Sequence, residues 1–199
     1  MMYALETSAD AVERRLDAAR MLAKSPMPVR QVDALNGWIS VAQEMTVTRA
    51  HLKPALFGRT LQFVTLVEIL ESGDDYRHVI EGREVVRWFG KAGKEPFSAL
   101  YAPEYLTRLR AFYRTVQMTG RPNRSDFMVM SIDEEELAFS QLVLPAMDER
   151  GVVNCLAIVM NFPDPLRRIP GAPLRIYAPW RQLHKGTATD TMLGDYNWR

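Results

Sequence analysis

Five apolar segments of strand length, interrupted by helices at one place only, constrain the fold of this chain more than any other feature. The segments are residues 61–70, 76–81, 125–132, 137–146 and 152–162. Helical patterns fill the gap after the second segment, over residues 82–90 and from about 103 to 119, and Gly120-Arg-Pro122 ends the longer one. Strands on both sides of a block of helices are typical of α+β folds. The sequence therefore predicts a five-stranded antiparallel sheet with helices on one face.

The stretch YRHVIEGREVVRWFG, residues 76–90, changes from strand to helix at Gly82. Val85, Val86, Trp88 and Phe89 recur at helical spacing after that glycine. We expect the strand to lie at an edge of the sheet and to lead into helices that cross the concave face. Trp88 and Phe89 would then fill the space between the helices and the sheet.

Two further helices are expected before the sheet, over residues 7–24 and 29–44, separated by the Lys24-Ser-Pro-Met-Pro28 break. The first carries apolar residues at alternating spacings of four and three, which is the pattern of a helix-packing seam. These residues are Leu5, Ala9, Val12, Leu16, Ala19 and Ala23. Such a seam packs either on its own domain or on a second copy of the chain. We expect a homodimer, and both packings stay open at this point.

The chain divides by composition into three parts. Residues 1–45 form an N-terminal helical extension, 46–163 form the domain that holds the sheet, and 164–199 form a C-terminal tail. The tail is rich in proline and aromatic residues and carries six Lys or Arg and three Asp, a net charge of +3. That charge is small for a nucleic-acid ligand, and prolines favour an extended chain. We interpret the tail as a strap over the domain or a contact for a partner protein.

The composition excludes several classes of protein. Among 199 residues, 47% are hydrophobic and 25% charged, which is ordinary for a globular chain and argues against disorder. A net charge of +1 provides no global field for nucleic acid or an anionic membrane. No apolar run is long enough to cross a bilayer, and the N-terminus does not match a secretory signal. A single cysteine fits a reducing compartment, so we expect a cytoplasmic protein.

The order of elements resembles the PAS domain, a sensory module built on a five-stranded antiparallel sheet. Within that family it is similar to the small stand-alone PAS proteins of alphaproteobacteria. The resemblance is carried by residues 76–90, by Tyr105-Leu-Thr-Arg-Leu-Arg-Ala-Phe-Tyr113, by Gly120-Arg-Pro122 and by Gln141-Leu-Val-Leu-Pro-Ala-Met147, and it covers about 46–163. One departure lies after Gly90, where the group has an Arg-Asp-Leu-Thr-Gly-like turn and this chain has Lys91-Ala-Gly-Lys-Glu-Pro96. The loop beside the expected pocket therefore differs.

Motifs for a cofactor, a metal or catalysis are sparse. Cys155 lies in an apolar strand pattern, which predicts a buried structural thiol, and it is not in the helix where flavin-adduct photoreceptors of this fold carry their cysteine. The helix from 103 to 119 has no histidine to hold haem, so flavin and haem are both disfavoured. Three scattered histidines do not form a metal site. The acidic residues at 133–136 indicate a solvated hairpin turn and not an ion site.

The sequence thus predicts a non-enzymatic sensory or adaptor protein that binds a small ligand, a protein partner or both, and signals through its flanking helices. The expected ligand-binding residues are Arg77, His78, Trp88, Phe89, Tyr113 and Phe127. The same residues also suit an ordinary core. Two alternatives stay open. One is a small α+β cone enzyme of the isomerase or dehydratase type with His78 or Asp126 as its acid or base, and the other is a scaffold with no ligand.

Overall fold

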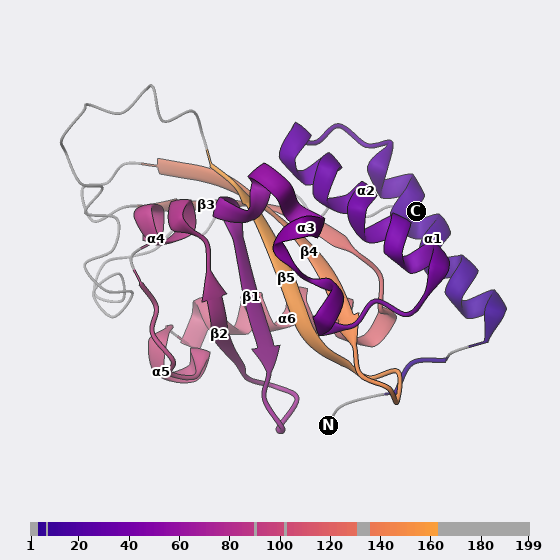
Figure 1. Ribbon diagram of the computed structural model, residues 1–199. Coiled ribbons are helices and arrows are strands. Elements are labelled where there is room, and N and C mark those ends of the chain that lie inside the picture. Colours follow the sequence, from indigo (N-terminus) through magenta and orange to yellow (C-terminus); the bar gives the residue numbers. More distant parts are fainter. Residues whose placement is uncertain (1–3, 7, 90, 102, 131–135, 163–199) are drawn as a thin grey trace.

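A five-stranded antiparallel sheet of order β2-β1-β5-β4-β3 forms the centre of the molecule (Figure 1). The computed structural model describes residues 4–6, 8–89, 91–101, 103–130 and 136–162. The strands are β1 (Val64–Ile69), β2 (Tyr76–Glu81), β3 (Asn123–Met130), β4 (Glu136–Met147) and β5 (Val153–Asn161). Since the helices enter after the second strand, the topology confirms the predicted α+β class and its PAS-like sheet.

Three helices cover one face of the sheet, here called the inner face: α4 (Arg83–Phe89), α5 (Phe97–Leu100) and α6 (Pro103–Thr119). β2 is an edge strand and leads directly into α4, as the sequence predicts. Trp88 and Phe89 are both buried in the apolar cluster between these helices and the sheet. The cluster also takes in Leu109 and Tyr113 from α6 and Leu156 from β5.

The opposite, outer face is covered by α1 (Ala9–Ala23) and α2 (Val29–Glu44). Ala19, Leu35 and Trp38 pack there with Leu144 and Ala157 of the two central strands. The seam residues Leu16 and Ala19 are buried within this single chain. The N-terminal helices therefore pack on their own sheet and make it the middle of three layers. This packing leaves the homodimer untested.

Two buried polar side chains fix α2 to the sheet. Gln31 is fully buried, and its Nε2 donates to the carbonyls of Ser140, at 3.3 Å, and Val159, at 3.0 Å. The indole Nε1 of Trp38 donates to the carbonyl of Pro145 at 2.8 Å. β3 pairs with β4 only as far as Val143, so that carbonyl has no strand partner on the β3 side. Buried carbonyls need such partners, and α2 supplies one.

The remaining short elements precede β1: η1 (Arg49–His51), α3 (Pro54–Phe57) and η2 (Gly58–Phe63). The apolar segment 61–70 predicted a longer strand, but its first residues belong to the 3-10 helix η2 and β1 begins at Val64. The sequence pattern gave no helix between residues 97 and 102, and α5 forms there over Phe97–Leu100. A four-residue helix is too short to show a period. The acidic turn 133–136 and the tail 164–199 lie outside the described residues.

Candidate functional site

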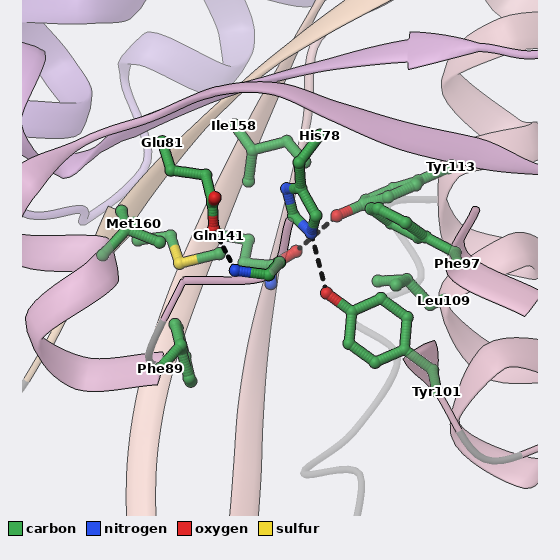
Figure 2. A pocket seen from close by; sticks show the side chains of 12 residues that line it. His78, Glu81, Phe89, Phe97, Tyr101, Leu109, Tyr113, Gln141, Ile158 and Met160 are labelled. Carbon is green, nitrogen blue, oxygen red and sulfur yellow. Dashed lines mark hydrogen bonds between the residues drawn. The ribbon is translucent and has the colours of Figure 1, made fainter. Parts of the chain in front are cut away.

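A small cavity of about 30 Å³ lies between the inner face of the sheet and the helices α4, α5 and α6 (Figure 2). Its wall is largely apolar, with Val85, Phe89, Phe97, Leu109, Ile158 and Met160. Five polar or titratable side chains interrupt this apolar surface: His78, Glu81, Tyr101, Tyr113 and Gln141. A cavity of this size has room for about two water molecules. It is therefore a compact polar site inside an apolar core.

A β-bulge in β2 brings two titratable groups to this wall. Leu66 of β1 pairs with Ile80 while Val67 pairs with His78, so Val79 is an extra residue on β2. The bulge breaks the alternation of side chains. As a result His78 and Glu81 both line the cavity, and the side chain of Ile80 is 51% exposed. Without the bulge, simple alternation would place Ile80 on the same face as His78.

The imidazole of His78 is held on one side only. Its Nε2 makes a 2.8 Å hydrogen bond with the hydroxyl of Tyr101, and its ring lies 4.6 Å from the ring of Phe97 between centroids. Its buried Nδ1 has no hydrogen-bond partner among the described residues. Burial lowers the pKa of this histidine to about 4, so the ring is neutral at pH 7. A neutral ring with a bare nitrogen can accept or donate one more hydrogen bond.

Glu81 lies where β2 ends, and its carboxylate is partly satisfied by the backbone. The N–H of Ala92 donates to Oε1 at 3.0 Å. Burial raises the pKa of Glu81, and hydrogen bonds from the backbone of Ala92 and Gly93 act in the opposite direction. The segment after α4 is thereby tied to the cavity wall through this carboxylate.

Gln141 is the polar residue of β4 that faces the cavity. It is 2% exposed and accepts a 3.4 Å hydrogen bond from the hydroxyl of Tyr113 on α6. The preceding residue, Ser140, points to the outer face, where its hydroxyl donates to Oε1 of Gln31 at 3.4 Å. Consecutive residues of one strand thus contact the cavity on one side and the N-terminal helices on the other.

Three of the six residues expected to bind a ligand line the cavity: His78, Phe89 and Tyr113. Trp88 and Phe127 are buried nearby in the same cluster but are not part of the wall. The ring of Trp88 stacks on Phe162, and the ring of Phe127 stacks on Phe139.

Arg77 lies on the opposite side of β2 from His78. There it pairs with Glu68 of β1, and the carboxylate of Glu68 also lies 3.8 Å from Arg49. Arg77 is therefore outside the cavity wall, because successive residues of a strand face opposite sides of the sheet.

Sequence reasoning missed Glu81, Tyr101 and Gln141. Gln141 carried a usable signal, because it is a lone amide ahead of the apolar run Leu142-Val-Leu144. Glu81 carried none, since the bulge that turns it inward has no mark in a stretch without glycine or proline. Tyr101 follows the unpredicted helix α5, so its position could not be inferred either.

The residues weighed for a cofactor or for catalysis lie away from the cavity. Cys155 is buried on the outer face among the residues that contact α1 and α2, and burial raises the pKa of its thiol to about 11. It cannot form a flavin adduct inside the cavity. Asp126 makes a two-pronged ion pair with Arg124, which also donates to Gln31 on that outer face.

The described residues hold neither a cluster of metal-ligating side chains nor a helix that could span a membrane. Within them, no three His, Cys, Asp or Glu side chains gather closely enough to hold a metal ion. None of their helices combines the length and the apolar character that crossing a bilayer requires.

Comparison with known proteins yields structural similarities only. No protein-family model matches the chain, and no curated protein matches it. Three solved structures share part of its fold at low identity. The first is the N-terminal domain of a diguanylate cyclase with a PAS/PAC sensor from Marinobacter aquaeolei, at 14% identity and a TM-score of 0.37 over 50% of this chain and 94% of that chain. The second is the light state of the blue-light photoreceptor Aureochrome1 LOV, at 15% identity and a TM-score of 0.38 over 57% of this chain and 89% of that chain. The third is an RNA-binding light-oxygen-voltage receptor, at 15% identity and a TM-score of 0.41 over 77% of this chain and 48% of that chain. At such TM-scores the PAS-like assignment rests on strand order and helix placement.

Proposed function

We propose that this chain is a cytosolic PAS-type sensory module, without enzymatic activity, that binds a compact ligand in the cavity of its inner face. The observation that carries the proposal is the group of polar side chains at one point of an apolar core: His78, Glu81, Tyr101, Tyr113 and Gln141. Buried polar groups cost stability unless they are satisfied, and Nδ1 of His78 is not satisfied by the described residues. A ligand that pairs with this nitrogen would remove the cost.

The cavity wall suggests the chemistry of the ligand. Glu81 offers a carboxyl group and Gln141 an amide, while the neutral ring of His78 offers one unpaired nitrogen. A small molecule that both donates and accepts hydrogen bonds suits these groups. Because the cavity holds about two water molecules, any larger ligand requires α4 and α5 to move outward. That movement is the signal we propose, since a ligand shifts a protein toward the conformation that it binds better.

β4 offers a direct path from the cavity to the N-terminal helices. Gln141 contacts Tyr113 at the cavity, and its neighbour Ser140 contacts Gln31 of α2. A change in strand position at Gln141 would alter the docking of α2. We propose that residues 1–45 act as the output helices of the domain at 46–163, toward a partner protein or a second copy of the chain.

One experiment tests the ligand. Purified protein is examined by denaturing mass spectrometry and by its absorption spectrum, and the copurified molecule is then added back in a thermal unfolding assay. We expect stabilisation of the native chain, and loss of that stabilisation in His78→Leu and Gln141→Leu. Arg77→Gln is the matched control, because Arg77 precedes His78 in β2 and faces the side of the sheet opposite to the cavity. Equal stabilisation of all variants would exclude the cavity as the site.

An acid–base enzyme remains the second candidate, because His78 and Glu81 share one cavity wall. Asp126, the other acid weighed from the sequence, lies in an ion pair on the outer face. Chemical change of the copurified molecule during incubation with the wild-type chain, absent with His78→Leu, would favour an enzyme. Absence of any copurified small molecule would favour a scaffold that acts through protein contacts alone.

A further inference from the structure

An open apolar groove of about 700 Å³ lies on the outer face of the sheet, beside β1 and β2. Its apolar wall consists of Leu52, Phe57, Leu61, Val64, Leu66 and Ile80. Polar side chains, among them Arg59 and Arg83, stand along its edge. This volume is within the range of sites that hold a drug-sized molecule or a few large side chains.

The helices on the outer face leave this groove uncovered within the described chain. α2 packs on β4 and β5, whereas the groove lies over β1 and the edge strand β2. Ile80 is 51% exposed there, because the bulge at Val79 turns it to the outer face. Ile80 thereby belongs to a contiguous apolar surface, and it is contiguous patches of this kind that mark interaction sites.

The chain leaves the sheet close to this groove. Val64, in the groove wall, pairs with Val159 of β5. Phe162 follows three residues later, so the exit of β5 is about 10 Å from that pair. Another 37 residues follow, from 163 to 199. Crossing from β5 over β1 to β2 also spans only about 10 Å, so the first part of this segment has ample reach.

The sequence after the exit contains an apolar stretch with the character of an extended strap. In residues 173–180, PLRIYAPW, prolines stand near both ends and the large apolar residues are Leu174, Ile176, Tyr177 and Trp180. Proline favours extended backbone and disfavours helix. Aromatic side chains bury large apolar areas, which is what an apolar groove of this size can accept.

We propose that residues 174–180 of this same chain dock in the groove lined by Ile80, Leu61 and Val64. A tethered segment is present at an effective concentration near millimolar, so it competes well against a second copy at micromolar concentration. The docked segment covers Ile80 and fastens the tail across the outer face.

Disulfide trapping in the full-length chain tests the position. The pair Ile80→Cys with Ile176→Cys should form a bond within one chain under mild oxidation, because a disulfide requires Cα atoms within about 7 Å. The control pair is Met118→Cys with Ile176→Cys, since Met118 is similarly exposed but lies on α6. Equal trapping in both pairs, or no trapping in either, overturns the proposal. Exclusive formation of linked dimers overturns it too and identifies a second copy as the occupant.

Limited trypsin digestion gives an independent measure that does not depend on cysteine geometry. Arg175 and Arg181 stand within and just after the docked stretch, and a docked segment resists cleavage. Ile80→Asp should speed cleavage at these two sites about tenfold or more, while Met118→Asp should leave the rate unchanged. Unchanged cleavage in Ile80→Asp contradicts docking. The groove shares only Glu81 with the cavity and does not include His78, so failure of the strap leaves ligand binding at His78 untouched.

Discussion

At the scale of single residues, the partial burial of a neutral histidine is the feature with the clearest physical consequence. His78 has a pKa of about 4 in the fold against 6.5 for an ordinary histidine. Between these pH values the unfolded chain binds more protons than the folded chain. The contribution of His78 to the free energy of unfolding is therefore at its full value above pH 6.5 and is lost as the pH drops toward 4.

We predict that, because of His78, the free energy of unfolding is about 2 kcal/mol lower at pH 5 than at pH 7.5. Below pH 4 the loss due to this residue reaches about 3 kcal/mol. Urea unfolding at the two pH values measures the loss. In His78→Gln the pH dependence should be weaker by that amount. Comparing the variant with the native chain cancels the other titrating groups, including Glu81, whose raised pKa acts in the opposite direction. Identical pH dependence in the two proteins would refute the neutral buried ring.

A second residue-scale prediction concerns Gln31, whose amide anchors α2. Gln31→Leu removes the donor to the carbonyls of Ser140 and Val159 and the acceptor for Arg124. We expect a loss of about 1–3 kcal/mol, the typical effect of leaving buried polar groups unpaired. Hydrogen exchange should quicken in α1 and α2 more than in α6. Gln43→Leu, an exposed glutamine on the same helix, is the control and should have little effect. Uniform acceleration across the chain would mean that α2 does not open separately.

At the scale of elements, the bulge in β2 determines which side chains face the cavity. Val79 is the extra residue, and the pairs on either side of it, Leu66 with Ile80 and Val67 with His78, are otherwise regular. Deleting Val79 would join these pairs into a continuous ladder without changing the face of any other side chain. Deleting Val67, which lies in the regular part of β1, would turn part of that strand over.

We therefore predict that the Val79 deletion folds, with Glu81 still at the cavity, while the Val67 deletion does not fold. The cost of the first deletion is the loss of one partly buried valine and should stay near 1–2 kcal/mol. Circular dichroism and urea unfolding distinguish the two outcomes. Failure of both deletions to fold would show that the bulge itself is required.

The bulge also shows how far the sequence could predict this structure. β2 was predicted with its observed bounds and α4 as the helix after it, because a strand pattern and a helix pattern meet at Gly82. The cavity wall was predicted only in part. Two of its polar residues, Glu81 and Tyr101, depend on a single extra residue in β2 and on the four-residue helix α5, and neither feature leaves a periodic signal in the chain.

The burial of Cys155 was predicted for the reason that the structure gives. Its strand is buried on both faces, and a continuous apolar run marks that situation. The packing partner of the N-terminal helices could not be predicted in the same way. An amphipathic seam records that one face is buried, but the tertiary contacts of Gln31 and Trp38 with β4 and β5 join residues more than 100 positions apart.

At the scale of the whole molecule, the sheet has helices on both faces and each layer serves a different role in the proposed function. The inner layer encloses the cavity, and the outer layer carries α1 and α2. Two residues of the seam that suggested a homodimer, Leu16 and Ala19, are buried within the chain, so these two are not available to a second copy. Large apolar side chains remain exposed on these two helices: Met21 is 65% exposed and Val29 75%.

These two residues flank the turn between α1 and α2, and we predict that a homodimer forms there. Light scattering coupled to size-exclusion chromatography should give twice the mass of the 22.8 kDa chain. Met21→Glu with Val29→Glu should return the mass to that of a single chain, since placing charges in an apolar interface opposes association. Met118→Glu on α6 is the control and should leave the dimer intact. A native chain that elutes as a monomer at tens of micromolar would contradict the dimer, and the proposed output of α1 and α2 would then require a different protein as its partner.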